Sequence, residues 1–109
     1  MAKFELYRSP NGEYRFRLKA ANGQTILTSE GYKTKAAAQN GIESVRKNAG
    51  REGGTEVYEG QGGKHYFRVK ARNGQVVGSS QGYASAAGAR KGVEAVQRAA
   101  DAGVADQTA

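Results

Sequence analysis

The chain has 109 residues, enough for one small domain or for two half-size units that share a core. Its 17 basic and 10 acidic side chains give a net charge of +7, and basicity of this size favours anionic partners through long-range attraction. The lack of cysteine excludes disulfides and cysteine-based zinc sites, and no apolar run is long enough to span a membrane. Because the N-terminus also lacks the apolar region of a signal peptide, we expect a cytoplasmic protein.

The sequence contains an internal duplication. When the chain is shifted by 51 positions, residues 4–49 overlay residues 55–100 without a gap, and 19 of the 46 positions are identical. A repeat this short is one supersecondary unit, whose apolar face needs the other copy to cover it. We therefore predict a single domain over residues 1–109, made of repeat 1 (residues 1–50) and repeat 2 (residues 51–109).

Three strands are predicted at the start of each repeat. Apolar and basic residues alternate along the second strand, as in a strand with one face on a core. Asn22-Gly23 and Asn73-Gly74 follow it and suit a hairpin turn, because both residue types tolerate positive φ. The predicted strands are residues 3–8, 14–21 and 24–29 in repeat 1 and residues 55–59, 65–72 and 75–80 in repeat 2.

The register of the third strand has two alternatives. Ile26 is matched by the apolar Val77 in repeat 2, whereas Leu27 is replaced by Gly78. A simple two-residue turn would direct Leu27 toward the core, and a bulge beside Gly23 would direct Ile26 toward it. We favour the bulge, and therefore Ile26.

A helix is predicted after the third strand of each repeat. Thr34 and Ser85 are candidate N-caps, because their hydroxyls can accept a hydrogen bond from a free backbone N–H. The apolar residues that follow recur at helical spacing and form one narrow stripe. Gly41 and Gly92 lie in this stripe, where glycine costs about 1 kcal/mol relative to alanine. Since both repeats carry this cost, we infer that the helix approaches the sheet closely there.

These elements together predict an α+β fold. Two tandem β-β-β-α(-β) repeats would form one antiparallel sheet, with two helices on one face and pseudo-twofold symmetry. The tail, residues 101–109, leaves two alternatives: it is disordered, or it adds a last short strand at Val104.

Strand alternation separates an apolar face from a basic one. We expect the helices to cover the face that carries Phe16 and water to contact the other. On that open face Glu5 would lie opposite Arg17, and Glu56 opposite Arg68, as cross-strand pairs of opposite charge. The candidate interaction residues on the open face are Tyr7, Arg15, Arg17, Lys19, Tyr58, Tyr66, Arg68, Lys70 and Arg72.

Two functions are compatible with this basic, tyrosine-containing face. Single-stranded nucleic acid needs such a surface, because cations meet phosphates and aromatic rings stack on bases. However, Glu5 and Glu56 would neutralise part of the patch, and arginine stems and tyrosines also pack across ordinary solvated strands. We therefore favour a non-catalytic interaction module with an unidentified partner, monomeric or a weak homodimer, and keep nucleic-acid binding as the alternative.

The sequence offers no arrangement of catalytic groups. Ser29 and Ser80 are duplicated, but no histidine is repeated beside them to act as a base. The only histidine, His65, replaces Tyr14 and lacks partners with metal-ligand spacing. The glycine-rich turns do not open a helix as a phosphate-binding loop does. We expect no enzymatic activity, no cofactor and no metal site.

Three segments of the chain resemble the YegP-like family of small bacterial proteins, which carry one or two copies of a domain of unknown function. The resemblance implies tandem β-β-β-α-β units in one sheet with terminal strands exchanged between units, residues 55–59 being one shared strand. Repeat 2 departs from the family motif at Lys91, where repeat 1 has the expected Asn40. No activity is established for the family, so no functional residue is transferred. The segments are residues 16–24 (Phe-Arg-Leu-Lys-Ala-Ala-Asn-Gly-Gln), 29–32 (Ser-Glu-Gly-Tyr) and 40–49 (Asn-Gly-Ile-Glu-Ser-Val-Arg-Lys-Asn-Ala).

Overall fold

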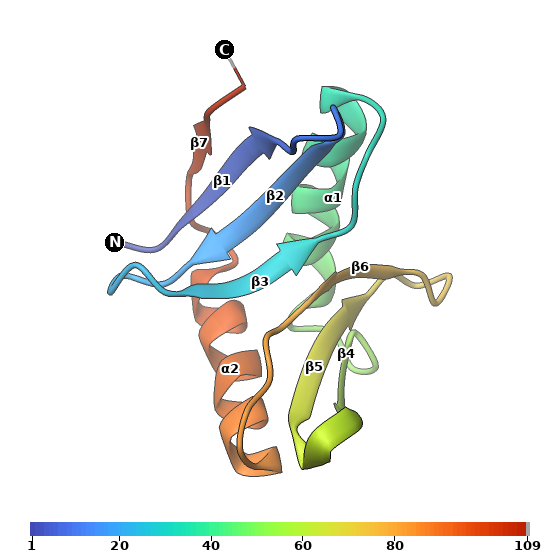
Figure 1. Ribbon diagram of the computed structural model, residues 1–109, viewed down its shortest axis with the longest axis vertical. Coiled ribbons are helices and arrows are strands. Elements are labelled where there is room, and N and C mark those ends of the chain that lie inside the picture. The colour runs from blue at the N-terminus through green and yellow to red at the C-terminus, as the bar shows by residue number, and fades with distance from the viewer. Residues whose placement is uncertain (109) are drawn as a thin grey trace.

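A computed structural model describes residues 1–108 and contains seven strands and two long helices (Figure 1). Each repeat supplies three strands followed by a helix, as the sequence predicts, and a seventh strand follows the second helix. The elements are β1 (Lys3–Arg8), β2 (Tyr14–Lys19), β3 (Thr25–Ser29), α1 (Lys35–Asn48), β4 (Thr55–Glu59), β5 (His65–Lys70), β6 (Val76–Ser79), α2 (Ala86–Ala99) and β7 (Val104–Asp106), with a short 3-10 turn at Gln61–Gly63.

All seven strands form one sheet in the order β4-β5-β6-β3-β2-β1-β7. The third strands of the two repeats, β3 and β6, meet in the middle, and each repeat extends outward from there. The strand after α1, β4, pairs with β5 of repeat 2, whereas the strand after α2, β7, returns to β1 of repeat 1. If each β-β-β-α-β unit is counted to the strand after its helix, the terminal strands β4 and β7 each pair within the other unit, as the family resemblance implies. The pseudo-twofold symmetry stays a prediction.

The last strand corrects one expectation and decides another. β7 runs parallel to β1, so the sheet is mixed and the prediction of a wholly antiparallel sheet is wrong. The reason is the connection, because a crossover through α2 can return the chain in a parallel direction whereas a tight turn cannot. Of the two alternatives for the tail, the short strand at Val104 is the one present, and the Asp106 carboxylate pairs with Lys35 of α1. Residue 109 lies outside the described residues.

The register of β3 also differs from the expectation. Gly23 has a φ of +86° in a three-residue turn, which places Thr25 opposite Lys19. A second irregularity at Ile26 then restores the phase, so that Leu27 lies opposite Leu18 and has no solvent exposure. The predicted bulge beside Gly23 is present, and Ile26 does lie in the hydrophobic core, where it is 9% exposed. The prediction missed that Leu27 faces the core as well, because the second irregularity makes Ile26 an extra residue of β3.

The meeting of β3 and β6 explains why Leu27 has a glycine as its counterpart. Thr28 pairs with Ser79, its own counterpart in repeat 2, so the residues that precede them lie close together across the seam. A Cβ atom on Gly78 would lie 3.0 Å from Leu27 Cγ and 3.1 Å from the Thr28 carbonyl oxygen. The seam therefore has room for one large side chain, and repeat 1 supplies it.

The helices pack on the inward face of the sheet and reach across the seam. α1 contacts β5 and β6 of repeat 2 as well as β1 and β2, and α2 contacts β3 of repeat 1. One hydrophobic cluster accordingly includes Phe16 and Leu27 from repeat 1 with Phe67 and Val96 from repeat 2. None of the described helices is long and apolar enough to cross a membrane.

The predicted helix caps and close approaches are confirmed. The Thr34 and Ser85 hydroxyls accept hydrogen bonds from the backbone N–H groups three residues later, at 3.1 Å and 3.0 Å. A Cβ atom on Gly41 would lie 2.8 Å from Phe16 Cε2, and a Cβ atom on Gly92 would lie 2.6 Å from Phe67 Cε2. Only glycine lets the helices lie this close to the Phe16 and Phe67 rings.

We expect Gly41→Ala and Gly92→Ala each to lower the free energy of unfolding by about 1–3 kcal/mol, although alanine favours the helix, because the added methyl overpacks a core ring. Gly88→Ala is the matched control, since its Cβ would lie no closer than 3.4 Å to a neighbour. That variant should gain up to about 1 kcal/mol in the same urea titration. Equal stability of all three variants would contradict the close approach.

Candidate interaction surface

One row of side chains crosses all seven strands on the face that the helices leave open. The pairing registers fix its members, and the residue types run from β4 and from β1 toward the middle as acid, base and hydroxyl, with Ala105 of β7 beyond Glu5. Two short hydroxyl residues, Ser79 and Thr28, therefore lie at the centre of the sheet, with an arginine on either side. From β4 to β7 the row is Glu56, Arg68, Ser79, Thr28, Arg17, Glu5 and Ala105.

Glu5 is a buried carboxylate at the centre of a cluster of partly exposed cations. Its carboxylate accepts a hydrogen bond of 2.6 Å from Arg17 Nε, and the ammonium groups of Lys3 and Lys19 lie 3.4 Å and 3.6 Å away. The side chain is only 5% exposed. The hydrogen bond from Arg17 lowers the pKa of Glu5 below its ordinary 4.5, although burial acts in the opposite direction. The Glu5 carboxylate thus remains ionised at neutral pH.

Glu56 forms the equivalent cluster in repeat 2 with one cation fewer. Arg68 Nε donates a hydrogen bond of 2.6 Å to the carboxylate, and Lys70 Nζ lies 3.9 Å from it. The hydrogen bond from Arg68 lowers the pKa of Glu56, but the side chain is 40% exposed. Both predicted cross-strand pairs are confirmed, and they differ in how much water reaches them.

Each arginine of the row also lies over a tyrosine ring. The Arg17 guanidinium carbon is 4.4 Å from the centroid of the Tyr7 ring, and that of Arg68 is 4.5 Å from the Tyr58 ring. Tyr66 stacks on Tyr58 with ring centroids 5.7 Å apart. Carboxylate and ring together hold each guanidinium in place, and the guanidinium in turn lies over one face of the ring.

The remaining predicted residues are less closely joined to this row. Arg15 lies beside Glu13 at 3.7 Å and donates a hydrogen bond to the Ser29 carbonyl oxygen. Arg72 is exposed in the turn after β5, which ends at Lys70, so its prediction as a residue of the strand face was wrong. The Asn73-Gly74 turn begins earlier than the alternation of residue types suggested.

Three members of the surface escaped the sequence interpretation. Lys3 lies at the start of β1 and contacts Glu5. Its position opposite Lys19 in the predicted hairpin could have indicated that it belongs to the basic face. Thr28 and Ser79 are central only because β3 pairs with β6, and contacts between repeats leave no pattern in one sequence. The hydroxyl centre of the row therefore required the structure.

The groups considered for catalysis have structural roles. The Ser29 hydroxyl accepts a hydrogen bond from the Phe16 N–H and donates one to the Glu30 carbonyl oxygen, both at 2.8 Å. Ser80 makes the same two contacts in repeat 2. Within residues 1–108, no cluster of three or more His, Asp or Glu side chains is placed to hold a metal ion.

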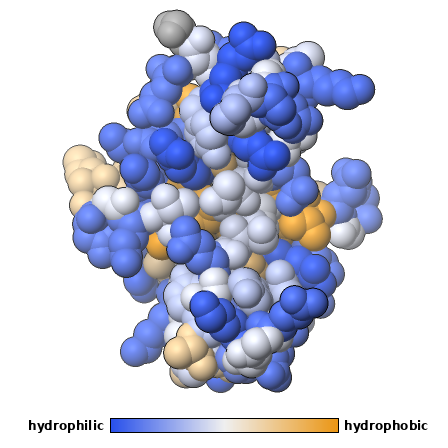
Figure 2. Space-filling model, viewed as in Figure 1, coloured by the Kyte–Doolittle hydropathy of each residue, from blue (hydrophilic) through white to orange (hydrophobic). Residues whose placement is uncertain are grey.

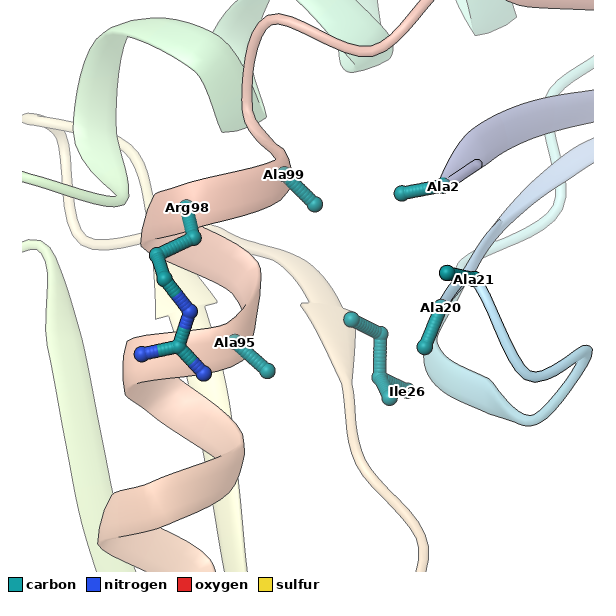
Figure 3. Close-up of a pocket in the computed structure, with 7 residues that line it drawn as sticks. All are labelled: Ala2, Ala20, Ala21, Ile26, Ala95, Arg98 and Ala99. Atoms are coloured by element: carbon teal, nitrogen blue, oxygen red, sulfur yellow. The ribbon is translucent and has the colours of Figure 1, made fainter.

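A groove of about 300 Å³ lies between α2 and the β2–β3 hairpin (Figure 3). Alanine side chains and Ile26 line it, and the only charged side chain at its rim is Arg98. It lacks the convergent polar groups that orient a small-molecule substrate. Elsewhere, in the view of Figure 2, polar residues cover most of the surface and apolar residues show only as small separate patches. The open sheet face is the better candidate for a binding surface.

Comparison with known proteins finds the family DUF1508, a domain of unknown function, twice in the chain, at residues 9–56 and 61–106. A UPF0339 protein of Pseudomonas aeruginosa is 54% identical over 108 residues, which cover 98% of both chains. The UPF0339 protein YegP of Escherichia coli O6:H1 is 49% identical over 94 residues, or 86% of each chain. The solution NMR structure of yegP from E. coli, a protein of unknown function, has a TM-score of 0.92 and 44% identity and covers 98% of this chain and 93% of that one. The predicted resemblance is confirmed.

The two carboxylate clusters predict different responses to mutation and pH. Glu5→Gln should lower the free energy of unfolding at pH 7 by about 1–3 kcal/mol, because it removes the buried negative charge that three neighbouring cations contact. Glu56→Gln should lower it by clearly less than Glu5→Gln does, because water reaches that pair.

Since the pKa of Glu5 is lowered by folding, its stabilisation is present above 4.5 and is lost as the pH falls through the folded value. Urea titrations between pH 7 and pH 3 should therefore bring wild type and Glu5→Gln together. A constant difference across that range would contradict the assignment.

Proposed function

Because the chain belongs to the DUF1508 family, whose members are described only as domains of unknown function, we propose its function from its surface. The protein is a non-catalytic binding module that holds an anionic surface of a partner protein against its open sheet face. The single observation that carries this proposal is the pair of carboxylate clusters on the open face, in which five ordered cations surround two carboxylates.

Within each carboxylate cluster, the cations outnumber the acid. Three cations contact the Glu5 carboxylate and two contact Glu56, so each cluster keeps an excess of positive charge. These side chains are already ordered by their internal contacts, so a partner that binds them loses less conformational freedom than one that must order free lysines. Arginine and tyrosine are also the residues that most often carry binding energy at protein interfaces.

The centre of the face offers space for a partner. Ser79 and Thr28 have short side chains, while Arg68 and Arg17 lean toward the carboxylates nearer the edges. An open depression of about 510 Å³ lies over β5 and β6, lined by Tyr58, Arg68 and Ser79 among others. A carboxylate placed there would meet the Ser79 hydroxyl and the Arg68 guanidinium, with the Glu30 side chain also in the lining.

Single-stranded nucleic acid is the second candidate, supported by the cations that alternate along β2 and β5. The rings fit it less well, because base stacking needs a free aromatic face. Arg17 lies over Tyr7, and Tyr58 lies between Arg68 and Tyr66 as a stacked partner of both. Phosphate contacts are open to this surface, but its rings are largely engaged within the protein.

A pair of matched charge variants tests the main proposal. Lys19→Ser with Lys70→Ser removes two charges from the open face, and Lys47→Ser with Lys91→Ser removes two from exposed positions on the helices. A photo-cross-linking residue at position 79 in cells should give a discrete protein adduct. We expect the face variant to lose this adduct and the helix variant to keep it, because only the face variant removes charges from the proposed binding surface. The net charge of the two variants is equal, so a general electrostatic effect would act on both alike.

A cross-linker at Ala87, on exposed α2, is the positional control. The proposal fails if positions 79 and 87 give the same adducts, or if the two charge variants lose them equally.

The nucleic-acid alternative makes a separate prediction. Fluorescence anisotropy with a thymidine oligonucleotide should show only weak binding that falls with salt, and Tyr66→Leu should change the affinity less than about twofold, because stacking contributes little. A loss of about tenfold or more on Tyr66→Leu would correspond to the 1–3 kcal/mol of base stacking and would favour the alternative.

A further inference from the structure

The two edges of the sheet end differently. On one side β1 is covered by β7, where the Phe4 N–H donates to the Gly103 carbonyl oxygen at 2.9 Å and the Gln107 N–H donates to the Leu6 carbonyl oxygen at 2.8 Å (Figure 1). On the other side β4 pairs with β5 alone. The counterparts of Phe4 and Leu6 in β4 are Thr55 and Val57.

The backbone N–H and C=O groups of these counterparts point away from β5, toward the open edge of the sheet. The Lys70 N–H donates to the Gly54 carbonyl oxygen, and the Gly60 N–H donates to the Lys64 carbonyl oxygen, both at 2.8 Å. Because hydrogen-bonded pairs alternate along an antiparallel ladder, the N–H and C=O groups of Thr55, Val57 and Glu59 face away from β5. Among the described residues, β4 thus offers an unpaired edge where β1 has a neighbour.

Side-chain burial differs in the same sense. Leu6 is fully buried, whereas its counterpart Val57 is only partly buried. Glu5 is 5% exposed and Glu56 is 40% exposed. On the β1 side, Ala105 of β7 lies beside Glu5, and Lys3 supplies a third cation that has no counterpart on β4, because Gly54 stands there.

We propose that β4 binds an extended segment of a partner protein in which apolar residues alternate with lysine or arginine. The segment adds a strand parallel to β4, as β7 does to β1. Its apolar side chains lie opposite Thr55 and Val57 on the helix side, and a basic side chain opposite Glu56 supplies the missing third cation. This edge adjoins the open face and shares Glu56 with it, but it binds through the backbone of β4 rather than through the arginines.

The charges at this edge distinguish that partner from a second copy of the chain. Asp106 of β7 pairs with Lys35, but the counterpart of Lys35 is Ala86, so an acidic strand like β7 would find no cation there. Pairing of β4 with β4 of another copy would gather Glu56 and Glu59 from both chains at one seam, which like-charge repulsion disfavours.

The test is an NMR titration of the full, isotope-labelled chain with a short peptide in which valine and lysine alternate. We expect shift changes along β4 and slowing of amide exchange at Thr55 by about tenfold or more, because its N–H gains an acceptor. Exchange at Phe4 should not change. A matched peptide of alternating valine and glutamate should bind about tenfold more weakly, because it places an acid beside Glu56.

Two variants separate backbone pairing from charge. Thr55→Pro removes the edge N–H and should abolish binding, with unchanged shifts in β1–β3 as the check on folding. Glu56→Gln should lower the affinity for the lysine peptide about five- to tenfold, whereas Glu43→Gln on exposed α1 should not change it.

Four results would overturn the proposal. These are shift changes at β1 and β7 instead of β4, equal binding of the glutamate peptide, β4 shifts that depend on protein concentration without peptide, and no binding at millimolar peptide. The third would indicate a second copy as the occupant, and the fourth an edge that its short length and Glu59 merely protect.

Discussion

The pairing of β3 with β6 holds the two repeats in phase, and the rest of the architecture depends on it. Thr28 opposite Ser79 places Arg17 and Arg68 on one face and Phe16 and Phe67 on the other. A slip by one residue would turn a whole repeat over, and one set of arginines would then face the helices. The core and the charged row are therefore consequences of the same register.

That register is fixed by packing rather than by hydrogen bonds alone. Leu27 fills the space that a side chain at position 78 would need, so the seam between β3 and β6 fits only a leucine on one strand and a glycine on the other. The helices add a second constraint. Each helix contacts strands of the other repeat, while its central glycine, Gly41 or Gly92, packs against a phenylalanine ring of the same repeat. Neither repeat could keep its inward face dry without the other.

The sequence predicted what is local or repeated. Both helix caps, both close approaches at Gly41 and Gly92, and both carboxylate–arginine pairs follow from patterns that occur once in each repeat. What it missed involves long-range pairing or small shifts of phase: the parallel β7, the second bulge at Ile26, and the hydroxyl centre at Thr28 and Ser79. A bulge changes which residue faces inward without changing composition, so alternation alone could not assign Leu27.

The positions at which the two repeats differ are the most informative about function. A residue that is the same in both repeats is explained by packing alone, since both copies build the same core. Glu5 and Glu56 recur in this way, yet one is closed by β7 and Lys3 while the other stays half open. The buried carboxylate of Glu5 already has three cations as partners within the protein. The exposed carboxylate of Glu56 has two and can accept a hydrogen bond from another donor. The edge at β4 and the open half of the charged row therefore belong to repeat 2, and binding partners would be expected to approach the protein from that half.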